Sequence, residues 1–113
     1  MKELTAKEAI ENVTAKEFKK NNGIVVRAAA LGKPRSWFDL EDIRDIVNNR
    51  MSDEEVIKCL FYLTDEGYFK VRHCDTKDEV DIADFDIEYL EFRIASKGTR
   101  LFECVEKDDL ILL

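Results

Sequence analysis

The feature that most constrains the fold of this chain is the stretch SDEEVIKCLFYLTDEGYFKV, residues 52–71, in which a helical pattern passes directly into a strand pattern. Ser52 and Glu55 have the spacing of a capping box, in which each side chain accepts a hydrogen bond from the backbone N–H of the other residue. A helix is therefore predicted to begin near Asp53. The apolar residues of its predicted core face recur every three or four positions and are Val56, Cys59, Leu60 and Leu63.

Two alternating segments after this helix predict a β-hairpin. Gly67 stands where a left-handed residue commonly ends a helix, and residues 68–74 follow it with a period of two. Residues 87–95 alternate in the same way, with Leu90, Phe92 and Ile94 on one face. The segment between them, residues 75–86, holds six acids and one lysine, which excludes a two-residue turn. We expect an antiparallel pair joined by a long acidic loop, with room for a short strand at residues 80–82.

The N-terminal region carries the sequence T-A-K-E twice, at residues 5–8 and 14–17, each time with the spacing of a helix start. This pattern predicts a short helix over residues 6–12 and a longer one over residues 15–31. Residues 21–23, Asn-Asn-Gly, weaken the longer helix and could break it in two. Its apolar residues are expected on one side and are Phe18, Val25, Ala28 and Leu31.

The remaining elements follow from caps and turns. Residues 32–35 contain a proline and form a turn, and residues 37–38 are expected to be extended. Asp39 is a good N-cap for a helix with Leu40, Ile43 and Val47 on its apolar face. A turn at residues 48–51 leads into the Ser52 helix, and Ser96 is expected to cap a final helix whose apolar residues are Leu101 and Val105.

Length and composition bound the class of protein. A chain of 113 residues, 45% apolar and 38% charged, fits one domain with a single core. We divide residues 1–113 into an extension at 1–14, a core at 15–107 and an apolar tail at 108–113. No stretch is long enough to span a bilayer, and the first residues lack the apolar block of a signal peptide. The expectation is a soluble cytoplasmic protein without a membrane partner.

The sequence indicates no catalytic residue, cofactor or metal site. Three cysteines that are widely spaced and lack a C-x-x-C pair predict reduced thiols rather than disulfides or a zinc site. His73 and Cys74 are adjacent, and on a strand they would point to opposite faces, which disfavours a catalytic pair. The acidic loop lacks both the glycine and the ligand order of an EF-hand. A non-enzymatic protein is therefore expected.

The order of the predicted elements resembles that of the winged helix-turn-helix superfamily. The residues that carry the resemblance are L-x-x-L-x-x-x-G-Y-F at residues 60–69 and F-x-I-A-S-K-G at residues 92–98. The chain also resembles the small stand-alone winged-helix proteins of bacterial and prophage genomes. The resemblance covers residues 15–107 and implies an α+β fold, in which a three-helix core carries a β-hairpin wing and helices at both ends.

The resemblance also implies a transcription regulator that binds double-stranded DNA, with its third helix in the major groove and its wing on the backbone or minor groove. The charge opposes that mode, because residues 51–113 have a net charge of −9 and residues 1–50 have +2. The outward side of the third helix carries Glu54, Lys58, Phe61 and Asp65. The candidate DNA contacts are Lys33, Arg35, Arg44, Arg50 and Lys58, and the alternative for these cations is an ordinary solvated surface.

The alternative function is a protein-binding adaptor on a winged-helix scaffold that does not bind DNA. Exposed apolar side chains support it, and the candidate interface consists of Ile57, Phe61, Leu110, Ile111, Leu112 and Leu113. A homodimer or another protein would cover these residues. For the tail at residues 110–113, the other possibility is packing against its own domain.

Overall fold

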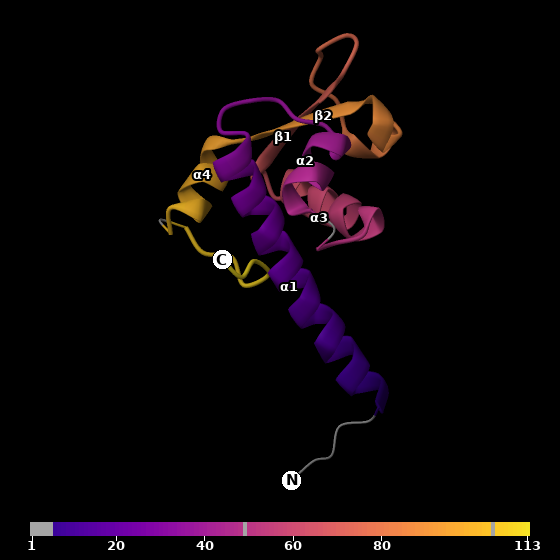
Figure 1. Ribbon diagram of the computed structural model, residues 1–113, viewed down its shortest axis with the longest axis vertical. Helices are drawn as coiled ribbons and strands as arrows, with labels where there is room; N and C mark the ends of the chain where they lie inside the picture. Colours follow the sequence, from indigo (N-terminus) through magenta and orange to yellow (C-terminus); the bar gives the residue numbers. More distant parts are fainter. Residues whose placement is uncertain (1–5, 49, 105) are drawn as a thin grey trace.

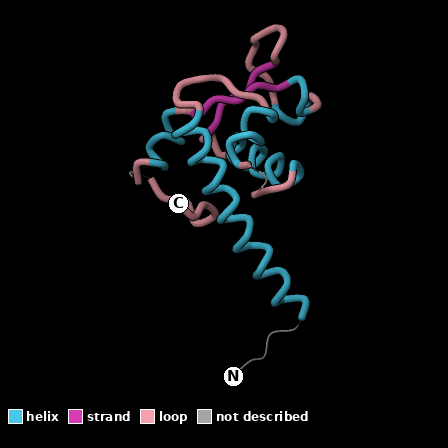
Figure 2. The backbone as a smooth tube through the Cα atoms, viewed as in Figure 1, coloured by secondary structure: helices cyan, strands magenta, loops and turns pink. Residues whose placement is uncertain are grey.

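The computed structural model describes the backbone of residues 6–48, 50–104 and 106–113, and side chains from residue 15 onward within these ranges. The fold is α+β, with four helices and a two-stranded antiparallel hairpin (Figures 1 and 2). The elements are α1 (Ala6–Gly32), α2 (Leu40–Val47), α3 (Asp53–Asp65), β1 (Phe69–His73), β2 (Leu90–Ile94) and α4 (Ser96–Phe102). Two 3-10 turns, Ile82–Asp84 and Ile87–Tyr89, lie between the strands.

Helix α3 begins and ends as predicted. The Ser52 hydroxyl oxygen accepts a hydrogen bond from the Glu55 N–H at 3.2 Å, and the Ser52 N–H donates to the Glu55 carboxylate at 3.0 Å. The four residues of the predicted core face are all buried. Gly67 has a φ of +82°, a left-handed conformation that an L side chain would strain. The local signals of residues 52–71 therefore predicted this part of the fold correctly.

The hairpin is antiparallel, with Phe69 opposite Ile94 and His73 opposite Leu90. Both strands are shorter than predicted, and β2 begins only at Leu90 because the chain makes a 3-10 turn over residues 87–89 before it. The predicted extended segment at residues 37–38 lies along the other edge of β2. There the Phe38 N–H donates to the Phe92 carbonyl at 2.8 Å, and the Phe92 N–H donates to the Phe38 carbonyl at 2.7 Å.

The acidic loop is present, but the short strand predicted at residues 80–82 is wrong. A single β-bridge joins Glu79 to Arg72, and a 3-10 turn then starts at Ile82. The Asp81 carboxylate accepts a hydrogen bond from the Ala83 N–H at 2.9 Å and caps this turn. Because Ile82 is also buried in the core, the loop is held at both Glu79 and Ile82.

Helix α1 is one continuous helix, so the prediction of two helices with a possible break at residues 21–23 is wrong. Asn22 is fully buried, and its amide donates a hydrogen bond to the Leu110 carbonyl at 2.9 Å. The Leu112 N–H donates to the Lys19 carbonyl at 3.0 Å, and the Leu112 carbonyl lies directly against Gly23. The tail thus packs against α1 at Asn22 and Gly23. Figure 1 shows the C-terminal segment beside the middle of α1. A small residue there makes room for the tail.

Two smaller expectations are also corrected. Leu31 is 70% exposed rather than on the core face, because at about 100° per residue it lies beyond Ala28, at the edge of the face that Val25, Ala28 and Ala29 bury. Ser96 is the first residue of α4 rather than its cap, and Ala95 at the cap position makes no side-chain hydrogen bond. Val105, expected on the apolar face of the last helix, lies outside the described residues.

The buried side chains form one cluster between α1, α2, α3, α4 and the inner face of the hairpin. Helix α1 contributes Val25, Val26, Ala28 and Ala29, and its N-terminal half extends beyond the other elements (Figure 1). Among the helices that the structure describes, none has the length and apolar content that crossing a bilayer requires.

Candidate nucleic-acid interface

The outward face of the hairpin carries cations near α4. Lys70 lies directly opposite Arg93 across the two strands, and Arg72 lies opposite Glu91. Because the alternate residues of β1 and β2 are buried in the core, these four side chains project from the opposite face. The Arg72 guanidinium lies 4.0 Å from the centre of the Trp37 ring, a cation–π contact that holds this arginine against the surface.

Three arginines meet at one end of this face. Arg35, Arg93 and Arg100 line a hollow of about 340 Å³, together with Ile94, Ser96 and Thr99. Arg35 comes from the loop between α1 and α2, where its φ of 56° places it in the left-handed region. Arg93 comes from β2 and Arg100 from α4. The hollow is therefore lined by arginines from three separate segments and by two hydroxyl-bearing residues, which are residue types suited to binding an oxyanion.

The ion pairs show where positive charge remains. Arg100 pairs with Glu106 at 2.9 Å, whereas no carboxylate of the described residues pairs with Arg35, Lys70 or Arg93. Farther along the hairpin, Glu91 lies 2.8 Å from the Lys77 ammonium and also contacts Arg72. The hydrogen bond from Lys77 and these charges lower the pKa of Glu91. The hairpin face therefore carries net positive charge beside α4. Toward the acidic loop, Glu91 balances part of the positive charge of Arg72 and Lys77.

Of the five cations predicted from sequence, Arg35 alone lines this hollow. Arg44 donates two hydrogen bonds to Asp53, at 2.8 and 2.7 Å, and these bonds hold the pKa of the Asp53 carboxyl below its usual value. The Lys58 ammonium lies 5.0 Å from the Phe18 ring. Lys33 is half-buried in the loop after α1, and Arg50 lines a different hollow beside α1.

The exposed side of α3 is acidic at both ends, as predicted. Its first turn holds Asp53, Glu54 and Glu55, all exposed, and its last residue is the exposed Asp65. The Glu55 carboxylate accepts hydrogen bonds from the Ser52 N–H, from the Asn21 amide and from the Ser52 hydroxyl. These bonds lower the pKa of Glu55, which therefore stays ionised at neutral pH. Such a surface repels phosphates, which argues against insertion of α3 into a DNA groove.

The predicted protein-interface residues occupy two places. On α3, Ile57 is half-buried and Phe61 is 37% exposed, and a partner contact through them stays a prediction. The tail packs against its own chain, which was one of the two possibilities for it. Within the tail Ile111 is buried and Leu113 is half-buried, whereas Leu110 and Leu112 face outward.

His73, Cys74 and Asp75 lie closer together than expected. Strand β1 ends at His73 and the chain turns at Cys74, so the strand geometry that would separate their side chains does not reach Cys74. Ligand atoms of all three residues lie within 4.8 Å of one another. His73 Nδ1 already accepts a hydrogen bond from the Asp75 N–H at 3.1 Å. Burial and the Asp75 charge raise the pKa of the Cys74 thiol, which therefore stays protonated at neutral pH. Both features weaken this group as a metal ligand set.

The thiols are expected to differ in reactivity. Cys104 is exposed, whereas Cys59 is buried, and burial raises the pKa of its thiol to about 12. In the folded protein at pH 8, DTNB should label Cys104 first, and Cys59 only after denaturant is added. The Cys104→Ser variant should lose the fast phase of the absorbance change, and rapid labelling of Cys59 in native buffer would contradict this assignment.

Sequence reasoning missed Lys70, Arg93 and Arg100 as members of the cationic face. The alternation of residues 87–95 already placed Arg93 on the outward side, but the register that sets Lys70 opposite it was not visible in the sequence. Comparisons of the chain with protein families, with curated proteins and with solved structures found no significant match.

Proposed function

We propose that this chain is a non-enzymatic, cytoplasmic DNA-binding regulator with a winged-helix fold. Four features of the architecture support the fold: three consecutive helices, the short connection between α2 and α3, the hairpin that follows α3, and the pairing of Phe38 with the outer edge of β2. The hairpin takes the position of the wing. Because a fold carries many functions, the proposal rests on the surface charges rather than on the architecture.

The observation that carries the proposal is the convergence of Arg35, Arg93 and Arg100 on one hollow, with Lys70 beside it on the same face of the hairpin. Arginine binds phosphate oxygens through two parallel N–H donors, and the Ser96 and Thr99 hydroxyls add neutral donors. Each phosphate that the protein neutralises releases counterions from the DNA, which favours binding at low salt. The hairpin face would therefore contact the DNA backbone.

The acidic surface of α3 fixes what kind of binding this can be. Sequence is read mainly by side chains that contact base edges in the grooves, and phosphate contacts position a protein without reading sequence. With α3 held away from the groove by its carboxylates, binding through the hairpin face would depend weakly on sequence and strongly on salt. This mode differs from the one that the winged-helix resemblance implies.

Charge reversal on the hairpin face is expected to abolish DNA binding. The variant Arg35→Glu/Arg93→Glu removes two cations from the hollow and replaces them with anions, so phosphates would be repelled. Binding to random duplex DNA, measured by fluorescence anisotropy from about 20 to 200 mM salt, should show log K falling linearly with log salt for the native chain, with a slope of roughly −0.9 per phosphate neutralised. The variant should show no measurable binding over this range.

The matched control is Arg50→Glu/Lys58→Glu, which changes the net charge by the same amount at two cations outside the hollow. It should retain most of the affinity and a similar salt slope. If both double variants lose binding equally, overall charge rather than the hairpin face governs the interaction. If the native chain does not bind DNA at low salt, the DNA proposal fails. The adaptor alternative, with Ile57, Phe61 and the tail at residues 110–113 as its candidate interface, then remains.

A further inference from the structure

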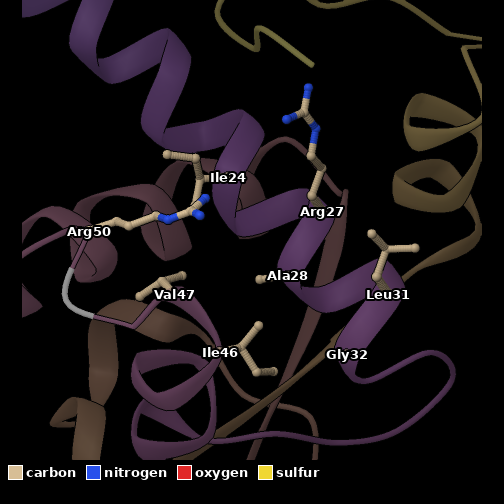
Figure 3. A pocket seen from close by; sticks show the side chains of 8 residues that line it. All are labelled: Ile24, Arg27, Ala28, Leu31, Gly32, Ile46, Val47 and Arg50. Carbon is tan, nitrogen blue, oxygen red and sulfur yellow. The ribbon is translucent and has the colours of Figure 1, made fainter.

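A second hollow lies between the C-terminal half of α1 and the end of α2 (Figure 3). It has a volume of about 250 Å³, and its lining is mainly apolar. Helix α1 supplies Ile24, Ala28 and Leu31, which stand four and three residues apart on one face of the helix. Ile46 of α2 faces them and lies over Gly32, where a Cβ atom would come within 2.7 Å of the Ile46 Cδ1 atom.

Two apolar side chains of this hollow are open to solvent. Leu31 is 70% exposed and Ile46 is 37% exposed, and the described part of the chain does not cover them. Ala28 belongs to the core and Ile24 packs against it, so the hollow lies at the edge of the buried face of α1, where Leu31 extends that face into solvent. Contiguous exposed apolar side chains on a small protein mark an interaction site more often than single ones do.

Two arginines give the hollow a positive charge. Arg27 and Arg50 both line it, no acidic residue does, and neither arginine forms an ion pair within the described ranges. In Figure 3 the Arg50 side chain extends toward Ile24. Glu17 and Glu55 line an adjoining hollow that also contains Arg50. Figure 3 shows the Arg27 side chain extending away from Ile46 and Val47, so its guanidinium lies at the rim of the hollow. In a chain of net charge −7, this apolar surface with cations around it complements an acidic ligand rather than a basic one.

The size of the hollow distinguishes between two kinds of ligand. Sites for small molecules commonly enclose about 300–1,000 Å³ and bury most of the ligand. A volume of about 250 Å³ that is open to solvent is smaller, but it accommodates an apolar side chain that projects from a longer segment. Peptide recognition of this kind combines an apolar anchor in a depression with charged pairs around it.

We propose that this hollow docks a short acidic segment of a partner protein. An apolar side chain of the segment packs against Ala28, Leu31 and Ile46, and neighbouring carboxylates pair with Arg27 and Arg50. The docking surface shares no residue with the Arg35, Arg93 and Arg100 hollow, so the proposal does not depend on DNA binding. It predicts that the partner is recognised by apolar residues flanked by Asp or Glu.

The test is selection from a random dodecapeptide library displayed on phage, with the full chain as bait. The selected peptides should carry a leucine, isoleucine or aromatic residue next to two or more acids. Their synthetic versions should lose at least tenfold in affinity for the Ile46→Glu variant and for the Arg27→Glu variant. A peptide with its acids replaced by lysine should bind Arg27→Glu more tightly than it binds the native chain.

The matched control is Phe61→Glu, because Phe61 is exposed to the same extent as Ile46, 37%, but lies on α3. It should leave peptide affinity unchanged, and thermal unfolding confirms that each variant is folded. If Ile46→Glu does not fold, Ile46→Gln takes its place, with a smaller loss expected.

Four outcomes would overturn the proposal. The first two are that no peptide is selected and that the selected peptides lack acidic residues. The third is that Phe61→Glu, rather than Ile46→Glu, loses peptide binding. The fourth is that light scattering shows a dimer of the native chain, which Ile46→Glu dissociates. The last result would assign the hollow to a second copy of this chain.

Discussion

Replacing Gly23 with alanine is expected to destabilise this protein, although alanine is the better helix former. Gly23 lies inside α1, where glycine costs about 1 kcal/mol relative to alanine. A Cβ atom at this position would overlap the carbonyl oxygen of Leu112, a backbone atom that cannot move without displacing the tail. Crowding of this kind typically costs about 1–3 kcal/mol. If the tail detaches instead, the overlap is relieved, but the packing of the tail, including the buried Ile111 side chain, is lost at a similar cost of about 1.5–3 kcal/mol.

The decisive measurement compares the effect of Gly23→Ala on the free energy of unfolding in the full chain and in a chain without residues 110–113, because the sign of this effect should change. In the full chain, Gly23→Ala should lower the free energy of unfolding by roughly 1–3 kcal/mol in urea titrations. In a chain that ends at Asp109 the overlap is absent, so the same substitution should raise the free energy of unfolding by about 0.5–1 kcal/mol. Equal effects in the two backgrounds would show that the tail does not pack on Gly23.

Gly32→Ala is the control within the same helix. Its added Cβ would meet the Cδ1 atom of the Ile46 side chain, which can change rotamer, rather than a backbone atom. Its effect should therefore be smaller and should not depend on whether residues 110–113 are present.

The contact between α1 and the tail also explains which parts of the fold the sequence could predict. The cap at Ser52 and the left-handed Gly67 depend on neighbours within a few residues, so their signals are local and were read correctly. Asn22 and Gly23 carry the local signal of a helix break, but their partners are in the tail, 88 residues away for the Asn22–Leu110 hydrogen bond. Local propensity cannot report a contact at that separation, and tertiary packing overrides it.

The candidate nucleic-acid interface was harder to predict for a similar reason. Net charge by sequence half pointed to residues 1–50, yet Arg93 and Arg100 belong to the acidic half. Strand alternation indicates which way Arg93 faces, but its meeting with Arg35 depends on the path of the loop after α1 and on the position of α4. Charge summed along the sequence does not show how charges are distributed on the surface.

Asp108 is expected to hold the tail in place through hydrogen bonds with two tyrosines. Its carboxylate accepts a hydrogen bond from the Tyr68 hydroxyl at 2.7 Å, from the Tyr62 hydroxyl at 2.9 Å and from the Leu110 N–H at 2.8 Å. Burial alone would raise the pKa of Asp108, but these hydrogen bonds together outweigh it and lower the pKa. Burial, followed by the bond to Asp108, raises the pKa of both tyrosines, so they remain donors up to high pH.

The pH dependence of stability follows from this lowered pKa. A carboxyl group whose pKa is lower in the folded state than in the unfolded chain, where it is about 3.9, stabilises the fold above that pH. The contribution is lost as the pH falls from about 3.9 through the folded-state pKa, because the protonated group no longer accepts charge-assisted hydrogen bonds. Thermal unfolding followed between pH 7 and pH 3 should show this loss in the native chain. In Asp108→Asn the unfolding temperature should fall less between pH 7 and pH 3 than in the native chain. The neighbouring Asp109→Asn should show the same fall as the native chain.

Removal of the Asp108 carboxylate should be among the most destabilising single changes outside the apolar core. Asp108→Ala leaves the hydroxyl of the buried Tyr68 and that of the half-buried Tyr62 without their charged acceptor, and each orphaned hydroxyl costs about 1–3 kcal/mol. The expected loss is therefore roughly 2–6 kcal/mol in urea unfolding at pH 7. In Tyr68→Phe, which has already lost one donor, Asp108→Ala should cost about 1 kcal/mol less, and this difference measures the Tyr68–Asp108 hydrogen bond. Additive losses in the double variant would show that Asp108 stabilises the tail without Tyr68, through the Leu110 N–H and Tyr62 alone.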